Sequence, residues 1–133
     1  MQKNITIKDI DEIVAEILSR VDTKPRVGMI LGSGLSDFAE SVENAVSIPF
    51  GDLPHWPIST VKGHAGRLVI GQIEGQDVFV LQGRIHFYEG YTMSQVTLPV
   101  RVMQRLGVEI MIVTNAAGGI ADEHKPGDVM LIT

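Results

Sequence analysis

The sequence predicts an α/β domain in which helices flank a mixed β-sheet. Apolar positions recur with helical spacing near the N-terminus, and short β-rich runs separated by glycine and polar turns follow them. Several of these runs are apolar throughout, which indicates strands covered on both faces. A chain of 133 residues fits one domain.

The first expected element is an amphipathic helix. Thr6 to Asp9 has the form of a capping box, in which each side chain accepts from the other residue's backbone N–H. Apolar residues keep a helical stripe that ends before Pro25. The stripe consists of Ile7, Ile10, Ile13, Val14, Ile17, Leu18 and Val21.

Strands are expected at 26–31, 46–50, 67–73, 76–82, 109–114 and 127–133. Glu74-Gly75 separates the third from the fourth and predicts a hairpin. The run 109–114 is the most apolar, so we expect a buried strand there. The last run is still apolar where the sequence stops, which suggests a fragment that ends within a strand.

Two segments between the strands have their own signatures. Residues 51–57 contain two prolines and Trp56, which predicts an irregular loop. Residues 94–106 are expected to be helical up to Gly107. Pro99 predicts a kink in this helix or a late start.

Composition excludes several function classes. The formal net charge of −5 argues against a general nucleic-acid surface. The absence of cysteine excludes thiolate catalysis and a disulfide scaffold. No signal-like segment or membrane-length apolar run is present, so we expect a cytoplasmic protein without membrane contact. No metal site is expected, because no close ligand spacing involves the histidines His55, His64, His86 and His124.

The loop Gln82 to Tyr91 is the richest in chemistry. Arg84 and His86 alternate along an extended strand exit, so both side chains can face one anion. Glu89 is placed to hold the far nitrogen of that imidazole and to favour its cationic form. The alternative for this loop alone is a surface ion-pair network with buried aromatic residues.

Three other glycine-containing loops carry weaker signals. Gly32-Ser33-Gly34 offers backbone N–H groups and a hydroxyl to an anion, although taken alone it is better explained as a tight strand exit. His64, between glycines, can contact a substrate or can be structural. Asn115 to Gly119 lets a flat ligand approach the backbone, with the Ala116 N–H facing an anion, or is simply a tight turn.

Together with Pro99-Val100-Arg101, these loops resemble the trimeric purine nucleoside phosphorylases in order and spacing across nearly the whole chain. They follow the inosine/guanosine pattern of that family. The resemblance implies the phosphorylase/hydrolase-like fold and reversible phosphorolysis of purine ribo- and deoxyribonucleosides in purine salvage, giving free base and (deoxy)ribose 1-phosphate. Inorganic phosphate is then the co-substrate, no cofactor is needed, and a homotrimer is expected.

The resemblance also implies roles for individual residues. Phosphate is expected to contact Ser33, His64, Arg84, His86 and the Ala116 amide. Tyr88 is expected to pack on the ribose, and the base pocket to include Ala117 and Gly118. His86 and Glu89 are the implied catalytic pair, in which Glu89 orients His86.

Family members continue well beyond 133 residues, so residues 1–133 are expected to be the N-terminal part of a single nucleoside phosphorylase domain. The base-recognition residues would then lie outside it, and the piece alone is expected to be inactive. Three alternatives stay open: a non-catalytic α/β module with half a phosphate site, a methylthioadenosine-type phosphorylase, and a nucleoside hydrolase that uses water.

Overall fold

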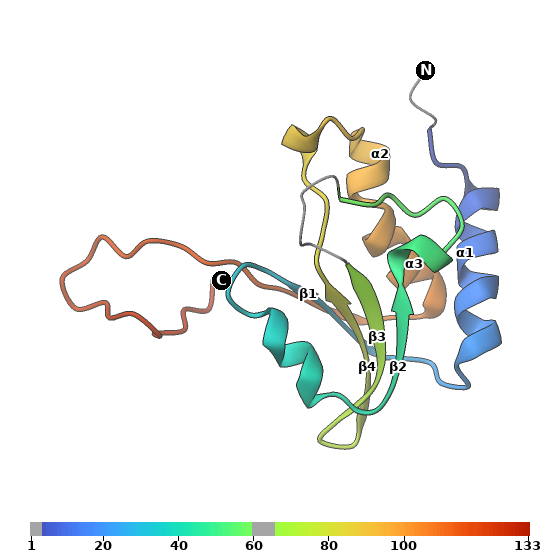
Figure 1. Ribbon diagram of the computed structural model, residues 1–133. Helices are drawn as coiled ribbons and strands as arrows, with labels where there is room; N and C mark the ends of the chain where they lie inside the picture. The colour runs from blue at the N-terminus through green and yellow to red at the C-terminus, as the bar shows by residue number, and fades with distance from the viewer. Residues whose placement is uncertain (1–3, 60–65) are drawn as a thin grey trace.

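The computed structural model describes residues 4–59 and 66–133 (Figure 1). Its centre is a five-stranded sheet with the order β2-β3-β4-β1-β5. The strands are β1 (Val27–Leu31), β2 (Glu43–Pro49), β3 (Arg67–Ile73), β4 (Gln76–Gln82) and β5 (Ile110–Val113). β3 pairs antiparallel with β2 and β4, whereas β1 pairs parallel with β4 and β5. The predicted mixed sheet is confirmed.

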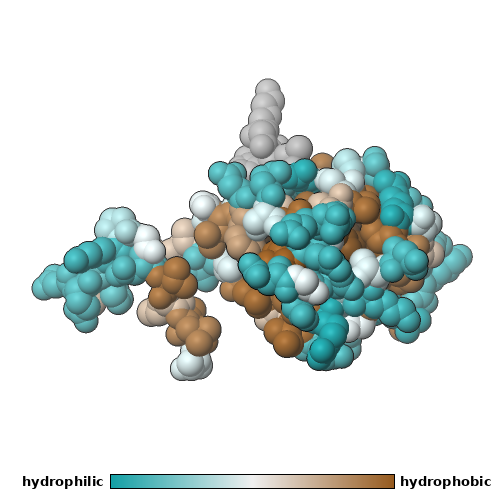
Figure 2. Space-filling model, turned by 90° about the horizontal axis from the view of Figure 1, so that it is seen from below, coloured by the Kyte–Doolittle hydropathy of each residue, from teal (hydrophilic) through white to brown (hydrophobic). Residues whose placement is uncertain are grey.

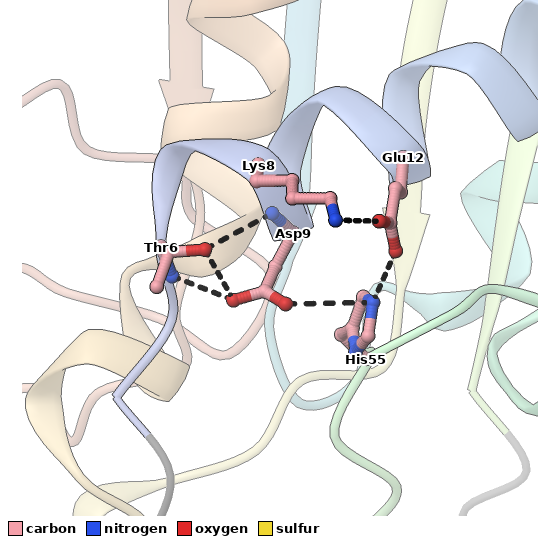
Figure 3. A network of polar contacts seen from close by, with 5 residues as sticks. All are labelled: Thr6, Lys8, Asp9, Glu12 and His55. Atoms are coloured by element: carbon pink, nitrogen blue, oxygen red, sulfur yellow. Dashed lines mark hydrogen bonds and ion pairs between the residues drawn. The ribbon is translucent and has the colours of Figure 1, made fainter.

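Helix α1 (Ile7–Arg20) begins at the predicted capping box. The Asp9 N–H donates to Thr6 Oγ1 at 3.2 Å, and the Thr6 N–H donates to Asp9 Oδ2 at 2.8 Å (Figure 3). The helix ends at Arg20, ahead of Pro25, as the sequence predicts.

His55 joins this helix to the loop after β2 (Figure 3). Its Nε2 lies 2.7 Å from Glu12 Oε2 and 3.5 Å from Asp9 Oδ1. His55 has φ +58°, a left-handed backbone that is uncommon outside glycine and asparagine. These contacts stabilise the packing of the loop against the first turns of α1.

Helices α1 and α3 (Leu98–Leu106) pack together on one face of the sheet (Figure 1). Side chains alternate along the hairpin strands, so Leu68 and Ile70 of β3 belong to this core. Val69 belongs to a smaller cluster on the opposite face, beside the 3₁₀ helix η1 (Ser36–Ser41). The sheet is thus covered on both faces in its centre.

The predicted helix 94–106 is broken into two pieces. Thr97 separates α2 (Met93–Val96) from α3, which has Pro99 near its start. Proline is tolerated in a first helical turn, where its missing N–H would have no partner. The late start that Pro99 predicts is confirmed.

Two strand predictions are wrong. β5 is a strand but is not buried: its four side chains are 42 to 54 % exposed. It is the last strand of the sheet order, and among the described residues it pairs with β1 alone. A strongly apolar sequence by itself therefore did not determine whether the strand is buried. Residues 127–133 form no strand. Residues 115–133 project from the sheet as a loop that turns back on itself (Figure 1), and no part of this segment pairs as a strand.

Hydrophobic side chains are consequently exposed along this C-terminal arm, residues 115–133 (Figure 2). They include Ile120, Val129, Met130, Leu131 and Ile132. Within the described ranges 4–59 and 66–133, no helix combines the length and the apolar character that a membrane span requires.

Candidate functional site

A pocket of about 210 Å³ opens where β1 and β4 end. Because these strands are parallel neighbours, with Leu31 opposite Gln82, their carboxyl ends meet at one edge of the sheet. The lining residues come mainly from the two strand exits and the segment after β4. They are Leu31, Gly32, Ser33, Ser36, Ser59, Gly83, Arg84, His86, Tyr88 and Glu89.

Arg84 and His86 face the same side, as their alternation predicts, while Ile85 between them is buried. Arg84 Nε donates to His86 Nε2 at 3.3 Å. Arg84 Nη1 donates to the Thr114 carbonyl oxygen at 3.3 Å. The guanidinium is therefore held at two points beside the pocket, which orients its other N–H groups.

Sequence reasoning missed the part that Thr114 plays in the site. Its Oγ1 accepts from the Gly32 N–H at 2.9 Å and donates to the Ile30 carbonyl oxygen at 3.2 Å. It thereby joins the exit of β5 to the exit of β1 while its own carbonyl receives Arg84. Its position directly after an apolar strand run was the available signal.

The carboxylate of Glu89 contacts the His86 imidazole at Nδ1, the ring nitrogen that Arg84 does not contact. Glu89 Oε1 accepts from the His86 backbone N–H at 2.8 Å and lies 3.1 Å from His86 Nδ1. The carboxylate side chain is only 4 % exposed. A carboxylate accepts and a guanidinium donates, so these contacts are those of an imidazole with its proton on Nδ1 and its lone pair on Nε2.

Ser59 supports the same carboxylate from the other side. Its hydroxyl donates to Glu89 Oε2 at 2.9 Å. Tyr91 donates its hydroxyl to the carbonyl oxygen of Ile58, next to Ser59 in the chain. Sequence reasoning missed Ser59, because nothing in its local pattern relates it to a loop 30 residues away.

Tyr88 stacks on His86, with ring centroids 4.8 Å apart and an angle of 14° between the ring planes. The tyrosine is 80 % exposed at the mouth of the pocket. An exposed aromatic face beside an anion-binding group suits a sugar that carries a charged substituent.

Other predicted site residues lie elsewhere. Ala116, Ala117 and Gly118 belong to the exposed C-terminal arm and are not among the residues that line the pocket. The structure thus brings Ser33, Arg84, His86, Tyr88 and Glu89 together and leaves these three apart. His64 lies outside the described residues.

A separate polar group lies at the start of α1. Asp9, Glu12 and His55 bring three possible metal-ligand atoms within 4.8 Å of one another (Figure 3). The expectation of no metal site rested on spacing along the sequence, which cannot reveal a group assembled by folding. All three side chains already make hydrogen bonds or ion pairs here.

Comparison with known proteins gives a consistent result. Residues 26–133 match the phosphorylase superfamily. The chain belongs to this superfamily. It is 52% identical over 124 residues to purine nucleoside phosphorylase 1 of Geobacillus stearothermophilus, covering 93% of the chain and 45% of that protein. Identity to the mouse (Mus musculus) purine nucleoside phosphorylase is 43% over 132 residues, covering 99% of the chain and 46% of that protein.

Solved structures agree. A purine nucleoside phosphorylase in complex with ribose-1-phosphate superimposes with a TM-score of 0.86 at 41% identity, covering 96% of this chain and 47% of the other. The Schistosoma mansoni enzyme in complex with inosine gives 0.82 at 41%, covering 92% and 43%. The predicted relationship to the purine nucleoside phosphorylases is confirmed, and the chain spans about half the length of these relatives.

Proposed function

We propose that the whole protein to which this chain corresponds catalyses phosphorolysis of purine nucleosides. Inorganic phosphate attacks the anomeric carbon, the bond from that carbon to the purine nitrogen breaks, and its electron pair leaves with the base. The products are a free purine and ribose or deoxyribose 1-phosphate. The observation that carries this proposal is the pocket, where Arg84, His86 and Ser33 converge beside an exposed tyrosine.

The polar groups of the pocket suit phosphate. Arg84 supplies charged donors, and Ser33 adds a hydroxyl at the glycine-flanked exit of β1. The single lone pair of His86 Nε2 accepts from Arg84 Nε at 3.3 Å, so Nε2 can accept from the hydroxyl of hydrogen phosphate, or donate to phosphate once it is protonated, only in place of that contact. A phosphate held there is positioned as a nucleophile, and its negative charge stabilises the oxocarbenium-like sugar as the base departs.

The remaining assignments belong to the same proposal. Glu89 orients His86, Tyr88 packs on the ribose, and His64 with the Ala116 amide completes the phosphate site. Ala117 and Gly118 line the base pocket once the C-terminal arm packs against the rest of the enzyme. The enzyme uses phosphate as co-substrate without a cofactor, acts in the cytoplasm and assembles as a homotrimer.

The test measures whether the whole protein releases hypoxanthine from inosine, with and without inorganic phosphate. Release that requires phosphate supports phosphorolysis, whereas release without it indicates a hydrolase. Methylthioadenosine serves as the competing substrate. If the enzyme cleaves it in preference to inosine, the proposal is wrong.

A second candidate function applies to this chain by itself: a phosphate-binding module without catalysis. The observation that favours it is the position of Ala116 to Gly118, away from the pocket. Calorimetric titration with inorganic phosphate tests it. Phosphate binding without nucleoside cleavage by the 133-residue chain would support the module.

A further inference from the structure

The carboxylate of Glu89 has its two oxygens engaged on opposite sides. Oε1 lies at hydrogen-bond distance from the backbone N–H and the Nδ1 of His86, at 2.8 and 3.1 Å. Oε2 accepts from the hydroxyl of Ser59 at 2.9 Å. Since this side chain is only 4 % exposed, water competes weakly for either oxygen. Both partners therefore contribute to the orientation of the carboxylate.

The two contacts on the His86 ring are directional. Glu89 can only accept from Nδ1 when it is ionised, and Arg84 Nε, 3.3 Å from Nε2, can only donate. The ring is consequently the tautomer that carries its proton on Nδ1. Rotation of the Glu89 carboxylate out of this plane would weaken the pattern, because neither of its two equivalent oxygens would then point at Nδ1.

We infer that Ser59 is a positioning residue: its hydroxyl helps to fix Glu89 so that His86 keeps its proton on Nδ1 and its Nε2 lone pair toward Arg84, at the edge of the pocket. A second contact keeps Ser59 in place, since the Tyr91 hydroxyl donates to the carbonyl of the preceding residue, Ile58. Residues 58–59 are thus joined to the segment 89–91 by two side-chain hydrogen bonds.

Ser59 has no catalytic role in the proposed function. Its hydroxyl contacts Glu89 rather than the imidazole, so its effect on His86 passes through the carboxylate. The effect on the tautomer stands on the geometry alone. The effect on anion binding rests on the proposed function, because it assumes that phosphate occupies the pocket. The two effects therefore need separate measurements.

The first measurement is the tautomer of His86 by ¹⁵N–¹H correlation of the imidazole ring in the histidine-labelled 133-residue chain. It is made at a pH of about 8.5, and the shifts of the two ring nitrogens report whether the ring is neutral. The His86→Asn variant assigns the signal. In the unsubstituted chain we expect the tautomer protonated on Nδ1 to predominate. Ser59→Ala should convert it into a mixture with the Nε2-protonated form, and Ser59→Thr, which keeps a hydroxyl, should restore it.

The second measurement is calorimetric titration with inorganic phosphate. Ser59→Ala should bind phosphate about 3- to 10-fold more weakly, the scale of one lost hydrogen bond, and Ser59→Thr should stay within about 2-fold. If the unsubstituted chain binds no phosphate, the proposed function loses its support, but the tautomer still decides the role of Ser59.

The unchanged signals of the other histidines and the circular dichroism spectrum show whether a variant is folded. Should Ser59→Ala fail to fold, Ser59→Cys replaces it as a nearly isosteric and weaker donor. A folded variant whose His86 tautomer matches the unsubstituted chain overturns the inference, even if its phosphate affinity falls. A shifted tautomer with unchanged phosphate affinity overturns the part that concerns the anion.

Discussion

Gly32 and Thr114 hold the ends of two parallel strands in direct contact. The Gly32 N–H donates to Thr114 Oγ1 at 2.9 Å, and a Cβ atom placed on Gly32 would lie 2.4 Å from the Thr114 carbonyl oxygen. That same carbonyl oxygen accepts from Arg84. The shape of the pocket at the exits of β1 and β4 thus depends on a close backbone approach that only glycine allows.

Gly32→Ala should therefore destabilise the fold by about 1–3 kcal/mol, because the added methyl group forces two backbones apart. Urea unfolding followed by circular dichroism measures this loss. Gly51→Ala is the matched control, since among the residues that the structure describes its added Cβ would approach only Ile58 Cδ1, at 3.9 Å. Equal stability of the two variants would show that the Gly32–Thr114 contact relaxes freely.

Arg84→Lys should weaken phosphate binding by about tenfold or more. Lysine keeps the charge but loses the planar fork, which here contacts His86 and Thr114 with different nitrogens. Calorimetric titration with phosphate measures the change. The control is Arg26→Lys, because Arg26 forms an exposed ion pair with Glu109 just before β1, at the opposite end of that strand. A loss of the same size in both variants would point to a general charge effect.

His55→Asn should lower the free energy of unfolding by about 1 kcal/mol. Asparagine tolerates the left-handed backbone that His55 adopts, but it is too short to bridge Glu12 and Asp9. The substitution therefore isolates the side-chain contacts from the backbone conformation. His124→Asn, in the exposed C-terminal arm, is the control and should leave stability unchanged in urea unfolding.

Sequence patterns correctly predicted those features of the structure that depend on contacts between residues close together in the chain. The capping box from Thr6 to Asp9, the turn at Glu74-Gly75 and the late helix start at Pro99 all involve residues a few positions apart. Arg84 and His86 were placed on one side by strand alternation alone. These features follow from backbone geometry, so the sequence was sufficient.

The missed features depend on contacts between distant segments. Ser59 meets Glu89 across 30 positions, and Thr114 meets Gly32 across 82. The exposure of β5 likewise depends on which strand becomes the edge, which hydrophobicity cannot tell. The predicted roles of all the site residues, His64 and Ala116 to Gly118 included, remain predictions.

Asp77 should make stability depend on pH in acid. Hydrogen bonds from Thr23 and then Gln72 lower the pKa of this carboxyl below its ordinary value of 3.8. Its ionised form is favoured in the folded state, so its stabilising effect is present above pH 3.8 and is lost as pH falls through the lower folded value.

Thr23→Val removes the principal donor, so the melting temperature should fall at pH 6 but much less at pH 2 to 3, which flattens the acid dependence. Thermal melts at these pH values measure it. Thr97→Val is the control, because the Thr97 hydroxyl donates to a backbone carbonyl. Losing that hydrogen bond should lower the melting temperature by the same amount at every pH. If Thr23→Val lowers the melting temperature by the same amount at all pH values, this account of Asp77 is wrong.

The exposed β5 should make the 133-residue chain self-associate. Its four apolar side chains, Ile110 to Val113, stand at the sheet edge, where unpaired backbone and apolar surface together favour pairing with another molecule. Ile112→Lys introduces a charge that opposes such pairing and should shift static light scattering toward the monomer mass. Leu18→Lys, on the exposed side of α1, is the matched control and should leave the association unchanged. A stable monomer without any substitution would show that this edge does not drive association.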